Sequence, residues 1–188
     1  MRVVHAEIDI QSIIHLIAQE GKDLIGLELG VCDGPSFVSI LKHCPNVKKL
    51  YGIDFWKPYT DILFSNDEQN PDHIRTEADV EYNEWMAHHR VKWSGESHRA
   101  KLIKKDSNDA VNDFKDEMFD FIFVDTYLNE EQAQKDLELW YPKVRTGGLF
   151  CGHDYDADCV SRSVSQFRFL NKIENPMSVY DSTYVWRK

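Results

Sequence analysis

Residues 24–36 read LIGLELGVCDGPS, and this stretch decides the fold. Leu24–Leu29 is a short, mainly apolar run of the length expected for a buried strand. Pro35 and Ser36 suit the first turn of a helix, which we expect to run to about His43. Glycines 30 and 34 lie in the turn between the two elements. The stretch therefore predicts a strand, a glycine-containing turn and a helix in direct succession.

Working outward from this unit, strands and helices alternate along the chain. Further strands are predicted at residues 49–53, 100–103, 119–124 and, after Gly147 and Gly148, 149–152. Helices are predicted at residues 7–20, 78–89, 129–140 and 160–170, and one more ends near Phe114. Two closing strands, 178–180 and 183–187, are expected to form an antiparallel hairpin. This alternation predicts an α/β fold, with a mainly parallel sheet and helices on both faces.

The length and composition predict one domain over residues 1–188. The hydrophobic content of 42% is enough for a sizeable core, and no linker-like stretch divides the chain. Within that domain we expect an N-terminal helix in residues 1–20. Residues 55–77 are aromatic at first and then polar, without a clear period, which is typical of a lid or an acceptor-side insertion.

Charge and hydropathy narrow the class of partner. The net charge of -10 argues against nucleic acid as the main partner, because affinity there depends on neutralising phosphates. No apolar stretch has the length of a membrane span, and the first residues lack the apolar core of a signal peptide. The four cysteines show no zinc-site spacing and are expected to be free thiols. We therefore expect a cytoplasmic protein that acts on a small molecule; whether it forms a homo-oligomer is left open.

Carboxylates follow or end the first five predicted strands. Strand ends often carry polar residues, so one such acid is a weak signal. The carboxyl ends of parallel strands meet at one edge of a sheet, where α/β proteins bind their ligands. Together the acids predict a binding edge for a ligand with hydroxyls and a positive charge. They are Glu28, Asp54, Asp106, Asp125 and Asp154.

The first turn discriminates between cofactors. A dinucleotide-binding turn reads G-x-G-x-x-G, but Cys32 and Pro35 occupy the second and third glycine positions here. The chain has instead the pattern E-x-G-x-x-x-G, which begins at Glu28. An acid at the end of the second strand, Asp54, commonly holds the ribose of a nucleoside. These features favour S-adenosylmethionine over a dinucleotide.

Five motifs in order carry a resemblance to a known family: LELGV at residues 27–31, YGID at 51–54, KDS at 105–107, FDFIFVD at 119–125 and GGLFCGHDY at 147–155. The chain resembles the class I S-adenosylmethionine-dependent methyltransferases, and within them the small-molecule branch that includes macrocin O-methyltransferase-like enzymes. The resemblance runs from about Leu24 to the C-terminus. It implies a Rossmann-like methyltransferase fold with a C-terminal antiparallel strand. The cofactor residues that it implies are Glu28, Gly30, Val31, Gly34, Ser36, Asp54, Phe55, Trp56, Asp106, Ser107 and Asp125.

The resemblance also implies a divalent metal, with Asp125, His153 and Asp154 as ligands. Magnesium suits a site of oxygen ligands and would lower the pKa of an acceptor hydroxyl. Asp125 and His153 are the candidate catalytic residues, with His153 either a ligand or a base. Members of the branch often read D-x-x-H-x-Y-E after the fourth strand, whereas this chain has Leu128 at the histidine position. A leucine neither takes a proton nor binds metal.

Three functions follow as hypotheses. The first is metal-assisted O-methylation of a small polar acceptor, with a sugar or a glycosylated metabolite as one candidate. The second, suggested by Leu128, is an S-adenosylmethionine-binding protein of the same fold without transferase activity. The third is a nucleotide-dependent oxidoreductase, which the first turn disfavours. His88 and His89 are expected to be solvated, because adjacent helical residues point about 100° apart and do not easily reach one ion.

Overall fold

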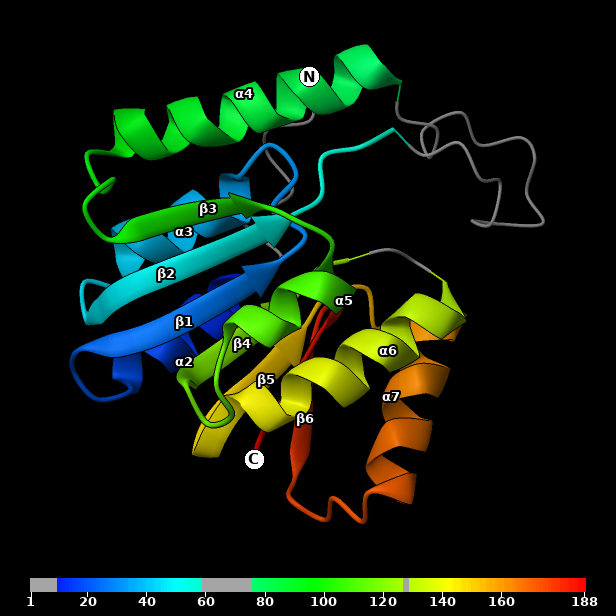
Figure 1. Ribbon diagram of the computed structural model, residues 1–188. Coiled ribbons are helices and arrows are strands. Elements are labelled where there is room, and N and C mark those ends of the chain that lie inside the picture. Colours follow the sequence, from blue (N-terminus) through cyan, green and yellow to red (C-terminus); the bar gives the residue numbers. More distant parts are fainter. Residues whose placement is uncertain (1–9, 59–75, 127–128) are drawn as a thin grey trace.

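The computed structural model describes residues 10–58, 76–126 and 129–188, and they form a seven-stranded sheet between two layers of helices (Figure 1). The strand order is β3-β2-β1-β4-β5-β7-β6, with the first five strands parallel and β7 antiparallel to both neighbours. This confirms the expected Rossmann-like α/β class. The strands are β1 (Leu24–Leu29), β2 (Val47–Asp54), β3 (Ala100–Lys104), β4 (Phe119–Val124), β5 (Val144–Gly152), β6 (Met177–Tyr180) and β7 (Thr183–Arg187).

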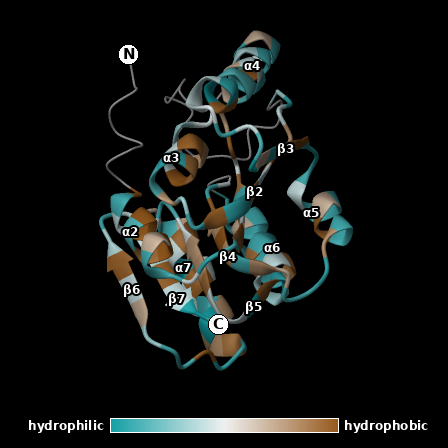
Figure 2. Ribbon diagram, turned by 90° about the vertical axis from the view of Figure 1, so that its left-hand side faces the viewer, coloured by the Kyte–Doolittle hydropathy of each residue, from teal (hydrophilic) through white to brown (hydrophobic). Residues whose placement is uncertain are grey.

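The helices divide between the two faces of the sheet. One layer holds α2 (Gln11–Gln19), α3 (Pro35–His43) and α4 (Glu77–Ser94). The other holds α5 (Ser107–Ala110), the 3-10 turn η2 (Val111–Asp113), α6 (Glu130–Trp140), the 3-10 turn η3 (Tyr141–Lys143) and α7 (Asp158–Leu170). Each layer buries its own cluster of apolar side chains against the strands. The central strands are accordingly hydrophobic, whereas α4 is largely hydrophilic (Figure 2).

Several predicted boundaries were wrong. The helix expected to end at His89 continues to Ser94. α4 is polar almost all round and buries only Val80, Ala87 and Val91. Such a helix has no apolar stripe from which its end can be predicted. The predicted helix that ends near Phe114 is only one turn of α-helix followed by a 3-10 turn. The two glycines at 147 and 148 lie within β5 rather than before it.

The sheet order fixes the place of a ligand. The chain winds from β1 outward to β2 and β3, and then returns to the other side of β1 to add β4 and β5. The winding direction therefore switches between β1 and β4, and the arrowheads of the parallel strands point to one edge (Figure 1). Ligands of open α/β sheets bind outside the carboxyl ends of the strands at such a switch point. No helix in the described part of the chain is long and apolar enough to cross a membrane.

Candidate functional site

The turn after β1 passes very close to β4 and α4. Gly30 has a φ of 83°, and a Cβ placed on it would lie 1.9 Å from the carbonyl oxygen of Asp125. Gly34 has a φ of 86° and begins α3, and a Cβ there would lie 3.2 Å from the Cα of Ala87. Both positions thus require glycine for backbone conformation and for close approach within the protein. These internal approaches already account for the two glycines of the E-x-G-x-x-x-G pattern.

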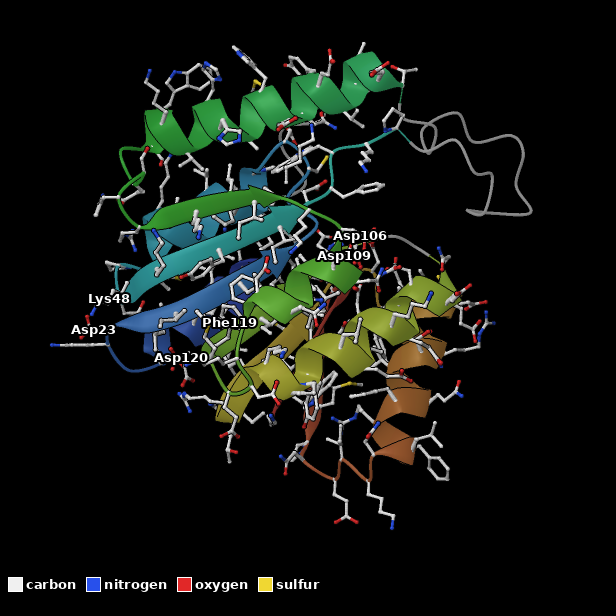
Figure 3. All side chains as sticks on the ribbon, in the orientation of Figure 1. Asp23, Lys48, Asp106, Asp109, Phe119 and Asp120 are labelled. Carbon is white, nitrogen blue, oxygen red and sulfur yellow. The ribbon has the colours of Figure 1, made fainter. Side chains whose placement is uncertain are left out.

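A cavity of about 160 Å³ opens at this switch point, beside the carboxyl ends of β1, β2, β3 and β4. Figure 3 shows Asp106 at that end of the sheet, opposite Asp23 and Lys48. Six of the residues expected to bind cofactor line the cavity: Gly30, Asp54, Phe55, Asp106, Ser107 and Asp125. Five other residues also line it: Cys32, Ile53, Lys105, Thr126 and Gln132.

Asp54 is held at the cavity by backbone amides. The amide of Cys32 donates to one carboxylate oxygen and the amide of Trp56 to the other, each over 2.8 Å. Burial raises the pKa of the Asp54 carboxyl, and these amide hydrogen bonds offset part of that effect. The Phe55 amide also donates to this carboxylate. A carboxylate has about four accepting positions in all, so Asp54 retains capacity for a ligand hydroxyl.

Glu28 lies beneath the cavity rather than on its wall. Its side chain is fully buried, and the Ser36 hydroxyl donates to one carboxylate oxygen over 2.5 Å. The other oxygen has no hydrogen-bond partner in the described part of the chain. Burial raises the pKa of Glu28 well above its usual range, and the charges of Asp125 and Asp54 raise it further, against the lowering effect of the Ser36 hydrogen bond. A buried acid with an unused oxygen is suited to a cationic group.

Besides Glu28 and its partner Ser36, three other expected cofactor residues do not line the cavity. Val31 and Trp56 are buried in the core. The indole N–H of Trp56 donates to the carbonyl oxygen of Cys32 over 2.8 Å, so Trp56 supports the turn from behind. Gly34 lies at the start of α3, against α4.

Polar side chains on another wall of the cavity are hydrogen-bonded to a buried acid that was not predicted from the sequence. Asp136 of α6 is fully buried and accepts hydrogen bonds from Ser107, Thr126 and Gln132. Burial raises its pKa, and these three hydrogen bonds lower it. The available signal was an acid on an apolar helix face, since Ala133, Leu137 and Trp140 are its buried neighbours on α6. Asp106 next to this wall caps α5 by accepting from the Asn108 amide over 2.9 Å.

The three expected metal ligands lie together. Ligand atoms of Asp125, His153 and Asp154 are all within 4.8 Å of one another. Nδ1 of His153 is 2.8 Å from Asp154 and 3.8 Å from Asp125. Its Nε2 is 2.9 Å from the hydroxyl of Ser182, in the turn between β6 and β7. Ser182 was not predictable from the sequence, because only the tertiary fold brings this turn to the end of β5.

Two other predictions concern the histidines of α4 and the segment after β2. His89 lies in mid-helix on α4, where its Nδ1 is 2.8 Å from the Trp85 carbonyl oxygen, so it does not mark a helix end. Leu128 and residues 59–75, the bulk of the expected insertion, lie outside the described residues, as do residues 1–9.

The charges around the cavity are mostly negative. Asp54, Asp106 and Asp125 line it, and Lys105, the only lysine among the described lining residues, binds Asp113 over 2.7 Å. A pyrophosphate would meet these carboxylates unfavourably, whereas a cation with ribose hydroxyls would be attracted. The site is therefore suited to a positively charged nucleoside.

Comparison with known proteins agrees with this arrangement. A family model described as a methyltransferase domain matches residues 27–155, well over half of the chain. No curated protein sequence matches. Among solved structures, the O-methyltransferase TomG from Streptomyces achromogenes, in complex with SAM, is similar at 16% identity and a TM-score of 0.62, over 94% of this chain and 78% of that one.

Two further solved structures share the fold at low identity. The O-methyltransferase NovP has 14% identity and a TM-score of 0.60, over 100% of this chain and 79% of that one. Precorrin 8W decarboxylase from Methanobacterium thermoautotrophicum has 14% identity and a TM-score of 0.59, over 95% of this chain and 89% of that one. These likenesses show the fold alone. With the match to the methyltransferase domain and the sheet order β3-β2-β1-β4-β5-β7-β6, the chain belongs to the class I S-adenosylmethionine-dependent methyltransferases.

Proposed function

We propose that this protein transfers the methyl group of S-adenosylmethionine to a hydroxyl of a small polar acceptor, as a single domain and with the help of a divalent cation. One observation carries the proposal: Asp125 lines the cavity at the switch point and also belongs to the cluster with His153 and Asp154. A methyl donor in the cavity and an acceptor at the cluster would then share one wall. That proximity is what a direct transfer between two bound molecules requires.

The cofactor would take its orientation from the acids of the cavity. Asp54 offers an acceptor to the ribose hydroxyls, and Asp106 and Ser107 lie where the adenine would bind. Glu28, with one carboxylate oxygen unused, supports a place for the methionine ammonium group near the turn after β1. The sulfonium adds a second positive charge in a cavity bordered by carboxylates.

The cluster of Asp125, His153 and Asp154 fits a divalent cation. Ligands in adjacent positions of an octahedral magnesium site are about 3 Å apart and opposite ones about 4 Å, as follows from bonds of about 2.1 Å. The separations of 2.8 and 3.8 Å from His153 to the two carboxylates fall in this range. A bound cation would supply Lewis acidity that lowers the pKa of an acceptor hydroxyl. Ser182 would orient the imidazole from its far side, as outer-shell partners of metal ligands do.

The chain's own residues would then position and deprotonate the acceptor. Methyl transfer from a sulfonium is an in-line displacement, so alignment of the acceptor oxygen with the methyl group supplies much of the rate. The hydroxyl proton would pass to the group formed by Asp125, His153 and Asp154. His153 contacts Asp154 through one ring nitrogen and Ser182 through the other, which fixes its plane. This arrangement offers a route for one proton despite Leu128 at the position of the family histidine.

Leu128 also favours a second candidate, a protein that binds S-adenosylmethionine without transferring its methyl group. The two candidates make the same prediction for the cofactor cavity and opposite predictions for the cluster.

Two measurements test the proposal. The first is thermal unfolding with S-adenosylhomocysteine or with NAD, for the wild type and Asp54→Ala. We expect stabilisation by S-adenosylhomocysteine alone, and its loss in the variant. The second is methyl transfer to a panel of hydroxylated acceptors, with magnesium or with a chelator, for the wild type, Asp154→Ala and the matched exposed control Asp156→Ala.

The outcomes separate the hypotheses. Transfer that needs magnesium and Asp154 but not Asp156 supports the full proposal. Transfer that survives both the chelator and Asp154→Ala removes the metal while leaving the methyltransferase. Cofactor binding without transfer to any acceptor favours the binding protein.

A further inference from the structure

We infer that Asp136 sets the hydrogen-bonding polarity of the cofactor cavity, so that its wall accepts hydrogen bonds and selects a 6-aminopurine over a 6-oxopurine. The inference deepens the proposed function and rests on it. Asp136 itself does not line the cavity. It acts through three polar side chains that do, namely Ser107, Thr126 and Gln132.

The surroundings of Asp136 are unusual for a buried acid. Its side chain is fully buried on the face of α6 that packs against the sheet, beside Leu137 and Trp140. Its three hydrogen bonds come from neutral groups: the hydroxyls of Thr126 over 2.6 Å and Ser107 over 2.8 Å, and the side-chain amide of Gln132 over 3.0 Å. Burying a carboxylate is costly unless donors satisfy it, and here every donor comes from the wall of one cavity.

The Asp136 carboxyl accepts hydrogen bonds at both of its oxygens, two at one and one at the other, so it dictates where its neighbours' hydrogens go. The single hydroxyl hydrogen of Ser107 points at Asp136, and so does that of Thr126. Only lone pairs of these two oxygens remain for a ligand. Both cavity-lining hydroxyls, which elsewhere could donate or accept, are thereby fixed as acceptors.

Gln132 is fixed in the same sense. Its amide nitrogen donates to Asp136 over 3.0 Å and to the Ser107 oxygen over 3.2 Å. Its carbonyl oxygen accepts from Asn108 over 3.3 Å and has a second lone pair. The Asp106 carboxylate, which also lines the cavity, is a further acceptor. The side chains bound to Asp136 therefore present acceptors, and their own donor hydrogens are consumed within the network.

The consequence concerns the base of the cofactor. Adenine carries an amino group at position 6, which donates two hydrogens, whereas hypoxanthine and guanine carry a carbonyl oxygen there. At position 6 an amino group donates to the acceptors of the wall, whereas an oxo group leaves acceptors facing one another without a hydrogen between them. N1 has the opposite polarity, an acceptor in adenine and an N–H donor in hypoxanthine, so the inference places Ser107, Thr126 and Gln132 against position 6 of the base rather than against N1. Sites built to hydrogen-bond one ligand group reject the analogue without it strongly, because buried polar groups are left unpaired.

The test compares two ligands in three proteins. Dissociation constants of S-adenosyl-L-homocysteine and S-inosyl-L-homocysteine are measured by calorimetry for the wild type, Asp136→Asn and Ser163→Ala. The side-chain amide at position 136 would donate to one of the hydroxyls, which must then turn its own hydrogen elsewhere. Ser163 is the matched control: its buried hydroxyl donates to the Cys159 carbonyl oxygen over 2.7 Å within α7, and it does not line the cavity.

We expect the wild type to prefer the adenosyl ligand by at least about 30-fold. This preference should fall at least tenfold in Asp136→Asn and stay unchanged in Ser163→Ala. If Asp136→Asn does not fold, Ser107→Ala removes one acceptor from the cavity wall itself, and the preference should then fall about threefold or more.

Three results would overturn the inference. Equal weakening of both ligands in Asp136→Asn would make Asp136 a purely structural residue. Equal affinity of the wild type for both ligands would show that the cavity wall does not distinguish an amino group from an oxo group at position 6 of the base. Failure of the wild type to bind S-adenosylhomocysteine at all would overturn the proposed function as well, which distinguishes the two failures.

Discussion

Acidic side chains at the two ends of the sheet have different partners. At the amino ends of the strands, Asp120 binds Arg145 over 2.7 Å and Asp23 lies 3.9 Å from Lys48 (Figure 3). At the carboxyl ends, the hydrogen bonds to Glu28 and to Asp54 come from neutral groups. Ser36 donates to Glu28, and backbone amides donate to Asp54.

The pKa values differ in the same way. Beyond the amino end, Lys143 lowers the pKa of the exposed Asp116 by a hydrogen bond and by its charge. At the carboxyl end, burial raises the pKa of Glu28 and of Asp54. The protein thus neutralises its acids where they serve only the fold. Glu28 is buried and Asp54 partly buried, and their hydrogen bonds come from neutral groups, so a bound cation would favour their ionised forms.

The largest effect is expected at the cluster that would meet the acceptor. Asp154→Ala should lower kcat/KM for methyl transfer by about 100-fold or more, because it removes both a ligand of the proposed cation and the carboxylate 2.8 Å from His153. Binding of S-adenosylhomocysteine should stay within about twofold, since Asp154 does not line the cofactor cavity at the switch point. If Asp154→Ala lowered methyl transfer and the affinity for S-adenosylhomocysteine by the same factor, the proposed division between the cofactor cavity and the cluster would be contradicted.

The next effect concerns the ribose. Asp54→Asn keeps the size of the side chain but removes its charge and part of its accepting capacity. We expect the affinity for S-adenosylhomocysteine to fall about 30-fold, or about 2 kcal/mol, as is typical of a lost hydrogen bond to a charged group. Calorimetry at pH 7 measures it. An unchanged dissociation constant would remove Asp54 from the cofactor site.

A smaller effect follows from the raised pKa of Glu28. Below its unfolded value near 4.5, both the folded and the unfolded chain hold the proton, so Glu28 contributes no pH dependence. As the pH rises above that value, the unfolded chain releases the proton first. Glu28 therefore lowers the free energy of unfolding until the pH passes its folded pKa, by at most about 1.4 kcal/mol per pH unit.

Glu28→Gln should abolish this decline in the ligand-free protein. Urea unfolding at pH 4 should give similar free energies for the two proteins, and at pH 7 the variant should be more stable by about 1 kcal/mol or more. The Ser36 hydroxyl still finds an acceptor in the glutamine carbonyl oxygen. Parallel pH profiles of the two proteins would show that Glu28 is not the group responsible.

The smallest effect is expected at the opposite end of the sheet. Asp23 and Lys48 are both exposed, with side-chain accessibilities of 77% and 68%. Asp23→Asn should change the stability by less than about 0.5 kcal/mol and leave cofactor affinity unchanged. A large loss of cofactor affinity in this variant would mean that net charge, rather than the position of the acids, governs binding.

Much of the fold was predictable because its strands are strongly apolar. The bounds of β1 and β4 agree with the prediction, since β1 lies between Asp23 and Gly30, β4 ends before Asp125, and both are buried on both faces. α4 was harder, because three buried residues in an eighteen-residue helix give no periodic signal.

The residues of the candidate site also differ in how far the sequence predicts them. Asp54 and Asp106 were predictable as cavity residues, because the end of a parallel strand fixes the edge to which its last residues belong. Asp136 and Ser182 were not, because their roles depend on contacts between distant segments. Asp136 reaches back 29 residues to Ser107, and Ser182 reaches back 29 residues to His153.

The central claim is that the acid-bordered cavity at the carboxyl end of the sheet binds S-adenosylmethionine or its product. Equilibrium unfolding in the presence of S-adenosylhomocysteine tests it most directly. At 100 times its dissociation constant the ligand should raise the free energy of unfolding by about 2.7 kcal/mol, and Asp54→Asn at the same ligand concentration should lose most of that gain. No stabilisation of the wild type by S-adenosylhomocysteine, or equal stabilisation by NAD, would contradict the account.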